Sequence, residues 1–225
     1  MQKSNAFYVV ATPIGNPDDI TLRAINILKE VDALICEEYR NGSRLLKKLG
    51  IDQKEIITLN EHNEDDKIEQ ILLRLAQGQS LALVSDCGTP LFSDPGHNLV
   101  SIVSTAGFKV VPVPGVSSLT AAISVTPIHM KQFLFAGFLP RVPKERTDEL
   151  RRLKSQKTGA PIILMDTPYR LSALLKDICS IFGKGQMITL ACNLTMQNEK
   201  ILTGPCSEVL QIIGSEKAEF MLILH

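Results

Sequence analysis

Two Ser-Asp pairs follow a short apolar run in the first half of the chain, and their residue types suit a small polar ligand. The run Leu81–Val84 predicts a buried strand, and residues 85–90 (SDCGTP) and 93–96 (SDPG) follow it. Asp86 could accept hydrogen bonds from ribose hydroxyls or from an ammonium group. The backbone at Gly88 and Thr89 could approach a flat ligand closely. Local Asx turns at both aspartates are the structural alternative.

A second loop of this kind lies between the expected first strand and first helix, where residues 11–19 read ATPIGNPDD. Pro13 fixes its own φ angle, Gly15 lets the backbone approach a bound group, and Asp18 or Asp19 could cap the helix. A tight turn with an acidic cap would explain the same residues. The loop lacks the G-x-G-x-x-G pattern, so it carries no dinucleotide fingerprint.

A third loop, residues 113–118 (VPGVSS), again joins a strand end to a helix start. Ser117 is suited to capping that helix, whose free N–H groups could bind a carboxylate or another anion. Capping alone would also explain the serines. Loops at the carboxyl ends of neighbouring parallel strands open on the same edge of a sheet, so the three loops together predict a ligand site.

The elements that must position these loops alternate regularly. From Phe7 to Val125, apolar runs rich in β-branched residues alternate with amphipathic stretches. This pattern predicts βα units and a mostly parallel sheet covered by helices. Beyond Thr126-Pro127, consecutive strand patterns around residues 193–197 indicate an antiparallel hairpin and a mixed sheet. We therefore expect an α/β protein with two α/β domains, residues 1–115 and 116–225.

Composition excludes several classes of protein. The chain has 225 residues, 24 Lys plus Arg, 24 Asp plus Glu, and 44% apolar residues, which argues against disorder and against a strongly basic nucleic-acid binder. No apolar run approaches the roughly 18 residues of a membrane span, and residues 6–11 are too few for a signal-peptide core. The five cysteines never occur as C-x-x-C, so neither a disulfide framework nor a Cys-rich zinc site is expected. The expected location is the reducing cytoplasm.

The loops also occur in a recognisable order along the chain. They comprise residues 9–16 (VVATPIGN), 19–24 (DITLRA), 61–64 (EHNE), 84–90 (VSDCGTP), 93–96 (SDPG), 113–115 (VPG), 138–141 (FLPR) and 204–210. In this order they resemble the tetrapyrrole methylase superfamily of S-adenosylmethionine-dependent methyltransferases. Within it they resemble the branch that methylates the ribose 2′-oxygen of a cytidine in small-subunit ribosomal RNA.

The resemblance implies two α/β domains of the tetrapyrrole methylase type, with S-adenosyl-L-methionine in the cleft between them. It further implies a homodimer, a ribosomal RNA partner, and no metal or membrane. The residues it assigns to donor binding are Pro13, Ile14, Asp86, Gly88, Thr89, Ser117, Ser118, Thr167 and Leu194.

A ribose hydroxyl is a poor nucleophile until its proton is removed, so a general base is expected beside the methyl group. The matched motifs offer Glu37, Glu38 and His62 as candidates, with Arg40 as a partner for phosphate or carboxylate. A structural charge cluster of Glu37, Glu38 and Arg40 is the alternative.

This chain departs from the family pattern on the acceptor side. It has CEEYR at residues 36–40 for Ala-Glu-Asp-Thr-Arg, Asn-Gly at residues 41–42 for His-Thr, and DTPYR at residues 166–170 for Glu-Ser-Pro-His-Arg. Methylation of a tetrapyrrole or another small molecule therefore stays open, as does a donor-binding module without catalysis.

One basic stretch could contact RNA. Residues 141–157 carry seven Lys or Arg against three Asp or Glu. Arg146, Arg151, Arg152 and Lys154 fall on a predicted helix, from which they could reach phosphates. A solvated amphipathic face is the alternative explanation.

Overall fold

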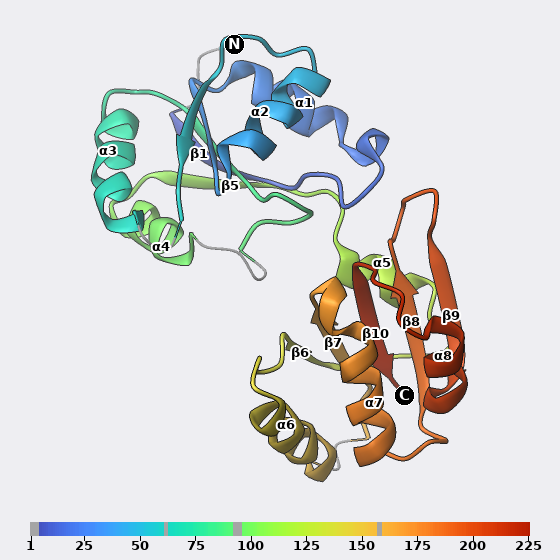
Figure 1. The fold of residues 1–225 in the computed structure, drawn as a ribbon. Helices are drawn as coiled ribbons and strands as arrows, with labels where there is room; N and C mark the ends of the chain where they lie inside the picture. Colours follow the sequence, from blue (N-terminus) through green and yellow to red (C-terminus); the bar gives the residue numbers. More distant parts are fainter. Residues whose placement is uncertain (1–4, 61–62, 92–95, 157–158) are drawn as a thin grey trace. The chain divides into compact units, whose positions relative to one another are not determined.

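A computed structural model describes residues 5–60, 63–91, 96–156 and 159–225. The chain divides into two compact units, residues 1–117 and 118–225. In the described parts, each unit is built on a five-stranded sheet (Figure 1). None of the described helices is long and apolar enough to cross a membrane.

The first unit is a parallel α/β structure, as the alternating pattern predicts. Its strands are β1 (Ala6–Val10), β2 (Ala33–Cys36), β3 (Glu55–Thr58), β4 (Leu81–Val84) and β5 (Lys109–Val113). Its helices are α1 (Leu22–Glu30), α2 (Tyr39–Lys48), α3 (Glu64–Ala76) and α4 (His97–Thr105), with a 3₁₀ turn at Pro17–Asp19. The strands pair in the order β3-β2-β4-β1-β5, and every pair is parallel.

Two apolar cores cover the two faces of this sheet. Residues of α3 and α4, such as Ile71 and Leu99, pack with Leu81 and Leu83 on one face. On the other face, Leu28 of α1 and residues of α2 pack with their own set of strand side chains. The central strands β2 and β4 are buried along their whole length, as strands covered on both faces must be. Figure 1 shows the two helix pairs on opposite sides of the sheet.

The edge strand β3 is absent from the predicted elements. Only one of its four residues, Ile57, is buried, so its apolar content is low for a strand of a parallel sheet. The β-branched run Ile56-Ile57-Thr58 is the one local signal for it. The opposite edge strand, β5, also buries one residue but has three valines, so its sequence pattern is the stronger of the two.

The second unit has a mixed sheet, and the predicted hairpin is confirmed. Its strands are β6 (Leu134–Gly137), β7 (Ile162–Asp166), β8 (Met187–Cys192), β9 (Lys200–Pro205) and β10 (Phe220–Leu224). Its helices are α5 (Ser118–Ser124), α6 (Pro143–Ser155), α7 (Leu171–Ile181) and α8 (Cys206–Ile213), with a 3₁₀ turn at Pro168–Arg170. The order is β6-β7-β10-β8-β9; β6 and β7 are parallel, and the remaining pairs, including β8 with β9, are antiparallel.

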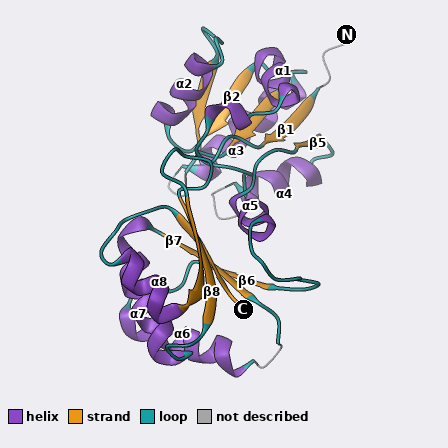
Figure 2. Ribbon diagram, turned by 90° about the vertical axis from the view of Figure 1, so that its right-hand side faces the viewer, coloured by secondary structure: helices purple, strands orange, loops and turns teal. Residues whose placement is uncertain are grey.

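Helices α6, α7 and α8 cover one face of the second sheet (Figure 2). Their apolar side chains, among them Leu150, Leu174 and Val209, form one core with Leu164 and Leu222 of the central strands. This core fixes the strand ends, and with them the loops that carry the expected site residues of this unit.

The structure contains one disulfide, which the cysteine spacing did not predict. Cys179 of α7 and Cys206 of α8 form a disulfide, with their Cα atoms 5.7 Å apart. Cys36 and Cys192 are buried thiols and Cys87 is an exposed one. Burial raises the pKa of the Cys36 and Cys192 thiols to about 11, so both stay protonated and unreactive near neutral pH.

We predict a thiol count that tests this pairing. Without reductant, the native protein should titrate one fast thiol with a chromogenic disulfide at pH 8, which is Cys87. After unfolding in guanidinium, still without reductant, the count should rise to the three free cysteines. Cys87→Ser should remove the native signal. Five thiols on unfolding without reductant would show that the disulfide is absent.

Candidate active site

The predicted donor loops meet at the carboxyl edge of the first sheet. The chain leaves β1 for α1 on one face and leaves the neighbouring strand β4 for α4 on the other face. Adjacent strands whose connections depart to opposite faces create a crevice at their carboxyl ends, which is where open α/β sheets bind ligands. The loop with Pro13 and Ile14 and the loop with Asp86, Gly88 and Thr89 are the two that meet there.

Hydrogen bonds join these two loops to each other. The backbone N–H of Thr12 donates to the carbonyl of Gly88 at 2.9 Å, and the Thr12 hydroxyl donates to the carbonyl of Ser85 at 3.0 Å. The Cys87 thiol lies 3.6 Å from the carbonyl of Ile14. Thr12 is buried and was not among the predicted site residues. Its position between a strand and Pro13 gives no sign that its partners lie more than 70 residues away.

Glycine is required where the loops approach most closely. Gly88 has a φ angle of +81°, and a Cβ there would lie 3.1 Å from Cγ2 of Ile14. A Cβ on Gly115, after β5, would lie only 2.9 Å from Cβ of Ala11. The Thr89 hydroxyl donates to the carbonyl of Val116 at 3.0 Å, which ties the β4 loop to the β5 loop. The three predicted loops of this unit are therefore one packed assembly.

Asp86 is exposed at this edge and is held by a residue in the first turn of helix α2. The side-chain amide of Asn41 donates to Oδ2 of Asp86 at 2.6 Å. A small pocket lies beside Asp86 and is lined by Glu37, Ser85 and Pro90 together with apolar strand residues. An anchored, solvent-facing carboxylate can accept hydrogen bonds from a polar ligand without first losing rotational freedom.

The predicted acid–base residues lie at the start of α2. Glu37 lines the pocket of Asp86, whereas Glu38 and Arg40 are exposed. The carbonyl of Glu38 accepts from the N–H of Gly42 at 3.1 Å and so begins the helix. No ion pair joins Glu38 to Arg40 in the part of the chain that the structure describes. His62 lies outside the described residues.

Two departures from the family pattern are in contact at this place. A Cβ on Gly42 would lie 2.6 Å from Sγ of Cys36, which is closer than real Cβ contacts. The pattern has Ala and Thr at these two positions. Cys36 on β2 is larger than the alanine of the pattern, and Gly42 on α2, which is smaller than threonine, leaves the space for it.

The expected site residues of the second unit lie at the ends of its elements. Thr167 is exposed directly after β7, and its N–H donates to Oδ1 of Asp166 at 2.7 Å. Leu194 is buried just after β8, at the same end of the sheet, since Phe220 of β10 pairs with both Asp166 and Cys192. Ser118 is the half-buried first residue of α5, and Ser117 immediately precedes it in the first unit.

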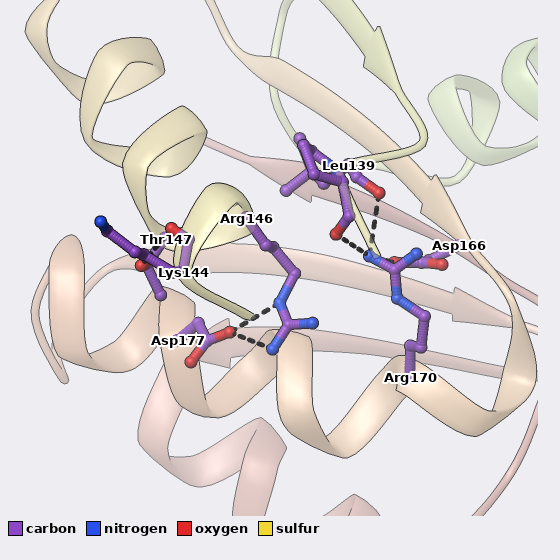
Figure 3. Close-up of polar contacts among 8 residues, drawn as sticks. Leu139, Lys144, Arg146, Thr147, Asp166, Arg170 and Asp177 are labelled. Carbon is purple, nitrogen blue, oxygen red and sulfur yellow. Dashed lines mark hydrogen bonds and ion pairs between the residues drawn. The ribbon is translucent and has the colours of Figure 1, made fainter. Parts of the chain in front are cut away.

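Buried Asp166 is partnered by Arg170, whose Nη2 lies 3.1 Å from Oδ2 of Asp166. Burial raises the pKa of Asp166, while the N–H of Thr167 and the charge of Arg170 act in the opposite direction. Arg170 also donates to the carbonyls of Leu139 at 2.9 Å and Pro140 at 2.7 Å, as Figure 3 shows. One guanidinium therefore fastens the loop after β6 to the turn after β7.

The predicted basic helix is only partly available to phosphates. Arg146 is buried, and its guanidinium pairs with Asp177 of α7 at 2.7 Å (Figure 3), so its assignment to phosphate contact was wrong. Arg151 and Arg152 are exposed but pair with Asp148 and Glu149 on their own helix. The acids that pair with Arg151 and Arg152 lie three residues away in the sequence, whereas the partner of Arg146 on the next helix cannot be recognised from the basic run.

Comparison with known proteins decides the family. The family model for tetrapyrrole (corrin/porphyrin) methylases matches residues 6–210, which is most of the chain. The chain belongs to the tetrapyrrole methylase family. It is accordingly an S-adenosylmethionine-dependent methyltransferase, and the fold predicted from its loops is confirmed.

Two relatives within the tetrapyrrole methylases match over nearly the whole chain. The ribosomal RNA small subunit methyltransferase I of Xylella fastidiosa is 40% identical over 229 residues, covering 100% of this chain and 83% of the relative. The protein of the same name from Escherichia coli is 38% identical over 222 residues, covering 97% and 77%. Uroporphyrin-III C-methyltransferase from Thermus thermophilus shares the fold, with a TM-score of 0.66 at 17% identity over 98% of this chain and 94% of that one.

Proposed function

We propose that this protein transfers the methyl group of S-adenosyl-L-methionine to the ribose 2′-oxygen of a cytidine in small-subunit ribosomal RNA. The observation that carries the proposal is the similarity of 38–40% over nearly the whole chain to enzymes named for methylating this RNA. The cytidine and the 2′-oxygen come from the motif resemblance. The proposal includes a homodimer in the cytoplasm, where ribosomal subunits are assembled.

The bound donor would supply an electrophilic methyl group, and the protein's task is then mainly to hold both reactants in line. We assign donor binding in the first unit to Pro13, Ile14, Gly88, Thr89 and Ser117, with Asp86 accepting from the donor's hydroxyl or ammonium groups. The assignment extends to Ser118, Thr167 and Leu194 of the second unit.

We assign removal of the ribose proton to Glu37. It lines the same pocket as Asp86, and a carboxylate within reach of the hydroxyl can accept its proton as the carbon–oxygen bond forms. Glu38, His62 and Arg40 remain the alternatives at this edge, with Arg40 suited to a phosphate. Glu37→Gln should therefore lower kcat while leaving the donor Kd unchanged.

The transfer itself can be tested directly. Donor binding is measured by calorimetry, and labelled donor is then incubated with small ribosomal subunits that lack the modification. Label on a cytidine ribose supports the proposal. Donor binding without transfer to subunits or free RNA contradicts it and favours a binding module. Transfer to a tetrapyrrole instead would place the chain with the small-molecule methylases.

Asp86→Ala should weaken donor binding roughly 10- to 100-fold, which is the effect of one lost hydrogen bond to a charged group. The fold should persist, because the Asp86 side chain is exposed and the side-chain amide of Asn41 that donates to it can turn to water. The matched control is Asp52→Ala, which removes an exposed carboxylate elsewhere in the same unit. Equal donor affinity in the two variants would reject the assignment of Asp86.

A further inference from the structure

Two large aromatic side chains are exposed on neighbouring loops of the second unit. Phe138 directly follows β6 and is 47% exposed, and Tyr169 lies in the turn after β7 and is 77% exposed. The loops are in contact, because Arg170 donates to the carbonyls of Leu139 and Pro140. Single exposed apolar residues are ordinary on a protein surface, but these two aromatics lie on loops that hydrogen bonds join to each other.

Positive charge accompanies these aromatics. Nζ of Lys217 lies 4.8 Å from the centre of the Tyr169 ring, and Arg141 is exposed one residue beyond Pro140. Arg151 and Arg152 of the adjacent helix are paired with acids, whereas no described residue forms an ion pair with Arg141 or Lys217. We call Phe138, Arg141, Tyr169 and Lys217 the aromatic–basic surface.

The aromatic–basic surface stands on a rigid support. Asp166 is buried and pairs with Arg170, which in turn donates to the two carbonyls of the neighbouring loop (Figure 3). The two aromatics therefore stand on backbone segments that these contacts hold together. Loops whose backbone is held in advance lose little freedom when a partner stacks on the rings that they carry. The burial of the Asp166 carboxylate has a desolvation cost, and its structural role is to position Arg170, which joins the two loops of the surface.

We propose that the aromatic–basic surface binds unpaired nucleotides of the RNA substrate, with Phe138 and Tyr169 stacking on bases and Arg141 and Lys217 contacting phosphates. Unpaired RNA bases are commonly bound by stacking on aromatic rings, and cations beside them neutralise the backbone. Two aromatic rings flanked by cations suit a nucleic-acid base and its phosphate better than they suit an acidic peptide. This inference rests on the proposed function and adds a location for the acceptor strand.

The test uses the full-length protein and a short, fluorescein-labelled, single-stranded RNA rich in cytidine, with binding followed by fluorescence polarisation. Tyr169→Ala and Phe138→Ala should each weaken RNA binding roughly 5- to 150-fold, whereas Tyr169→Phe should retain most of it. The double variant Arg141→Gln, Lys217→Gln should lose two phosphate contacts. The slope of the logarithm of the RNA association constant against the logarithm of the salt concentration should then become shallower by about 1.4, at about 0.7 for each contact. The donor Kd should stay unchanged in every variant.

Phe133→Ala is the matched control, because Phe133 is 42% exposed at the opposite end of β6. The RNA affinity of Phe133→Ala should equal that of the protein without substitutions. If the unmodified protein binds RNA and the Tyr169→Ala, Phe138→Ala double variant binds it equally well, the inference is overturned and the proposed function stands. If the unmodified protein neither binds nor methylates RNA, both are overturned.

Discussion

Replacing Asp177 with alanine should lower the free energy of unfolding of the second unit by about 3 kcal/mol. The variant leaves the guanidinium of Arg146 without its carboxylate, and that side chain is only 7% exposed. A buried charge that loses its partner keeps its desolvation cost and loses the attraction that offset it. Urea unfolding followed by circular dichroism measures the loss, and hydrogen exchange of α6 and α7 locates it.

Two further variants separate the buried charge from the ion pair itself. Arg146→Met together with Asp177→Leu removes both charges and should be within about 1 kcal/mol of the parent, because no unpaired charge is left in the core. Asp148→Ala breaks the exposed pair with Arg151 and should change stability by less than about 1 kcal/mol. An Asp177→Ala variant as stable as Asp148→Ala would show that Arg146 reaches water.

Gly42→Thr, which restores the family residue, should destabilise the first unit by about 2 kcal/mol, within the usual range for overpacking. The new Cβ would meet Sγ of Cys36 at 2.6 Å and Cδ2 of Leu34 at 3.3 Å. Both neighbours are fully buried strand residues of β2, so neither can move aside into solvent. The shift in thermal midpoint and in urea midpoint measures the effect.

Rescue distinguishes this clash from a general intolerance of the helix start. Cys36→Ala combined with Gly42→Thr should recover more than half of the lost stability, giving a coupling energy typical of residues in contact. Gly185→Ala serves as the control, because a Cβ there has open space around it. A double variant that is no more stable than Gly42→Thr alone would place the strain at Leu34 instead.

Much of the fold follows from local patterns in the sequence. The central strands are continuous apolar runs such as Leu81–Val84, and the helices between them have one apolar face, so the alternation predicts the parallel sheet. Edge strand β3 escapes this reasoning because it has only two apolar residues between polar ones, whereas edge strand β5, which also buries a single residue, has three valines. An edge strand can be recognised from sequence where its apolar, β-branched content is high.

The candidate site was predictable as a set of loops but not as a set of contacts. That Asp86 lies at a strand end follows from the run before it, whereas its partner Asn41 is 45 residues away, in the first turn of a helix. Cys179 pairs with Cys206 across 27 residues, and Arg146 is buried by Asp177 across 31. Such pairs depend on how helices pack, which no local pattern encodes.

The joining of the donor loops by main-chain atoms bears on how this enzyme can diverge. The contacts of Thr12 with Gly88 and Ser85, and of Thr89 with Val116, all end on backbone carbonyls. A carbonyl is present whatever side chain a position carries, so a replacement at Val116 leaves the acceptor for Thr89 in place. Ser85 is less free to change, because its hydroxyl also bonds the backbone of Cys87. Mutational tolerance should thus be broad at Val116 and narrow at Thr12, Gly88 and Gly115, so that substrate preference can drift while the donor loops keep their shape.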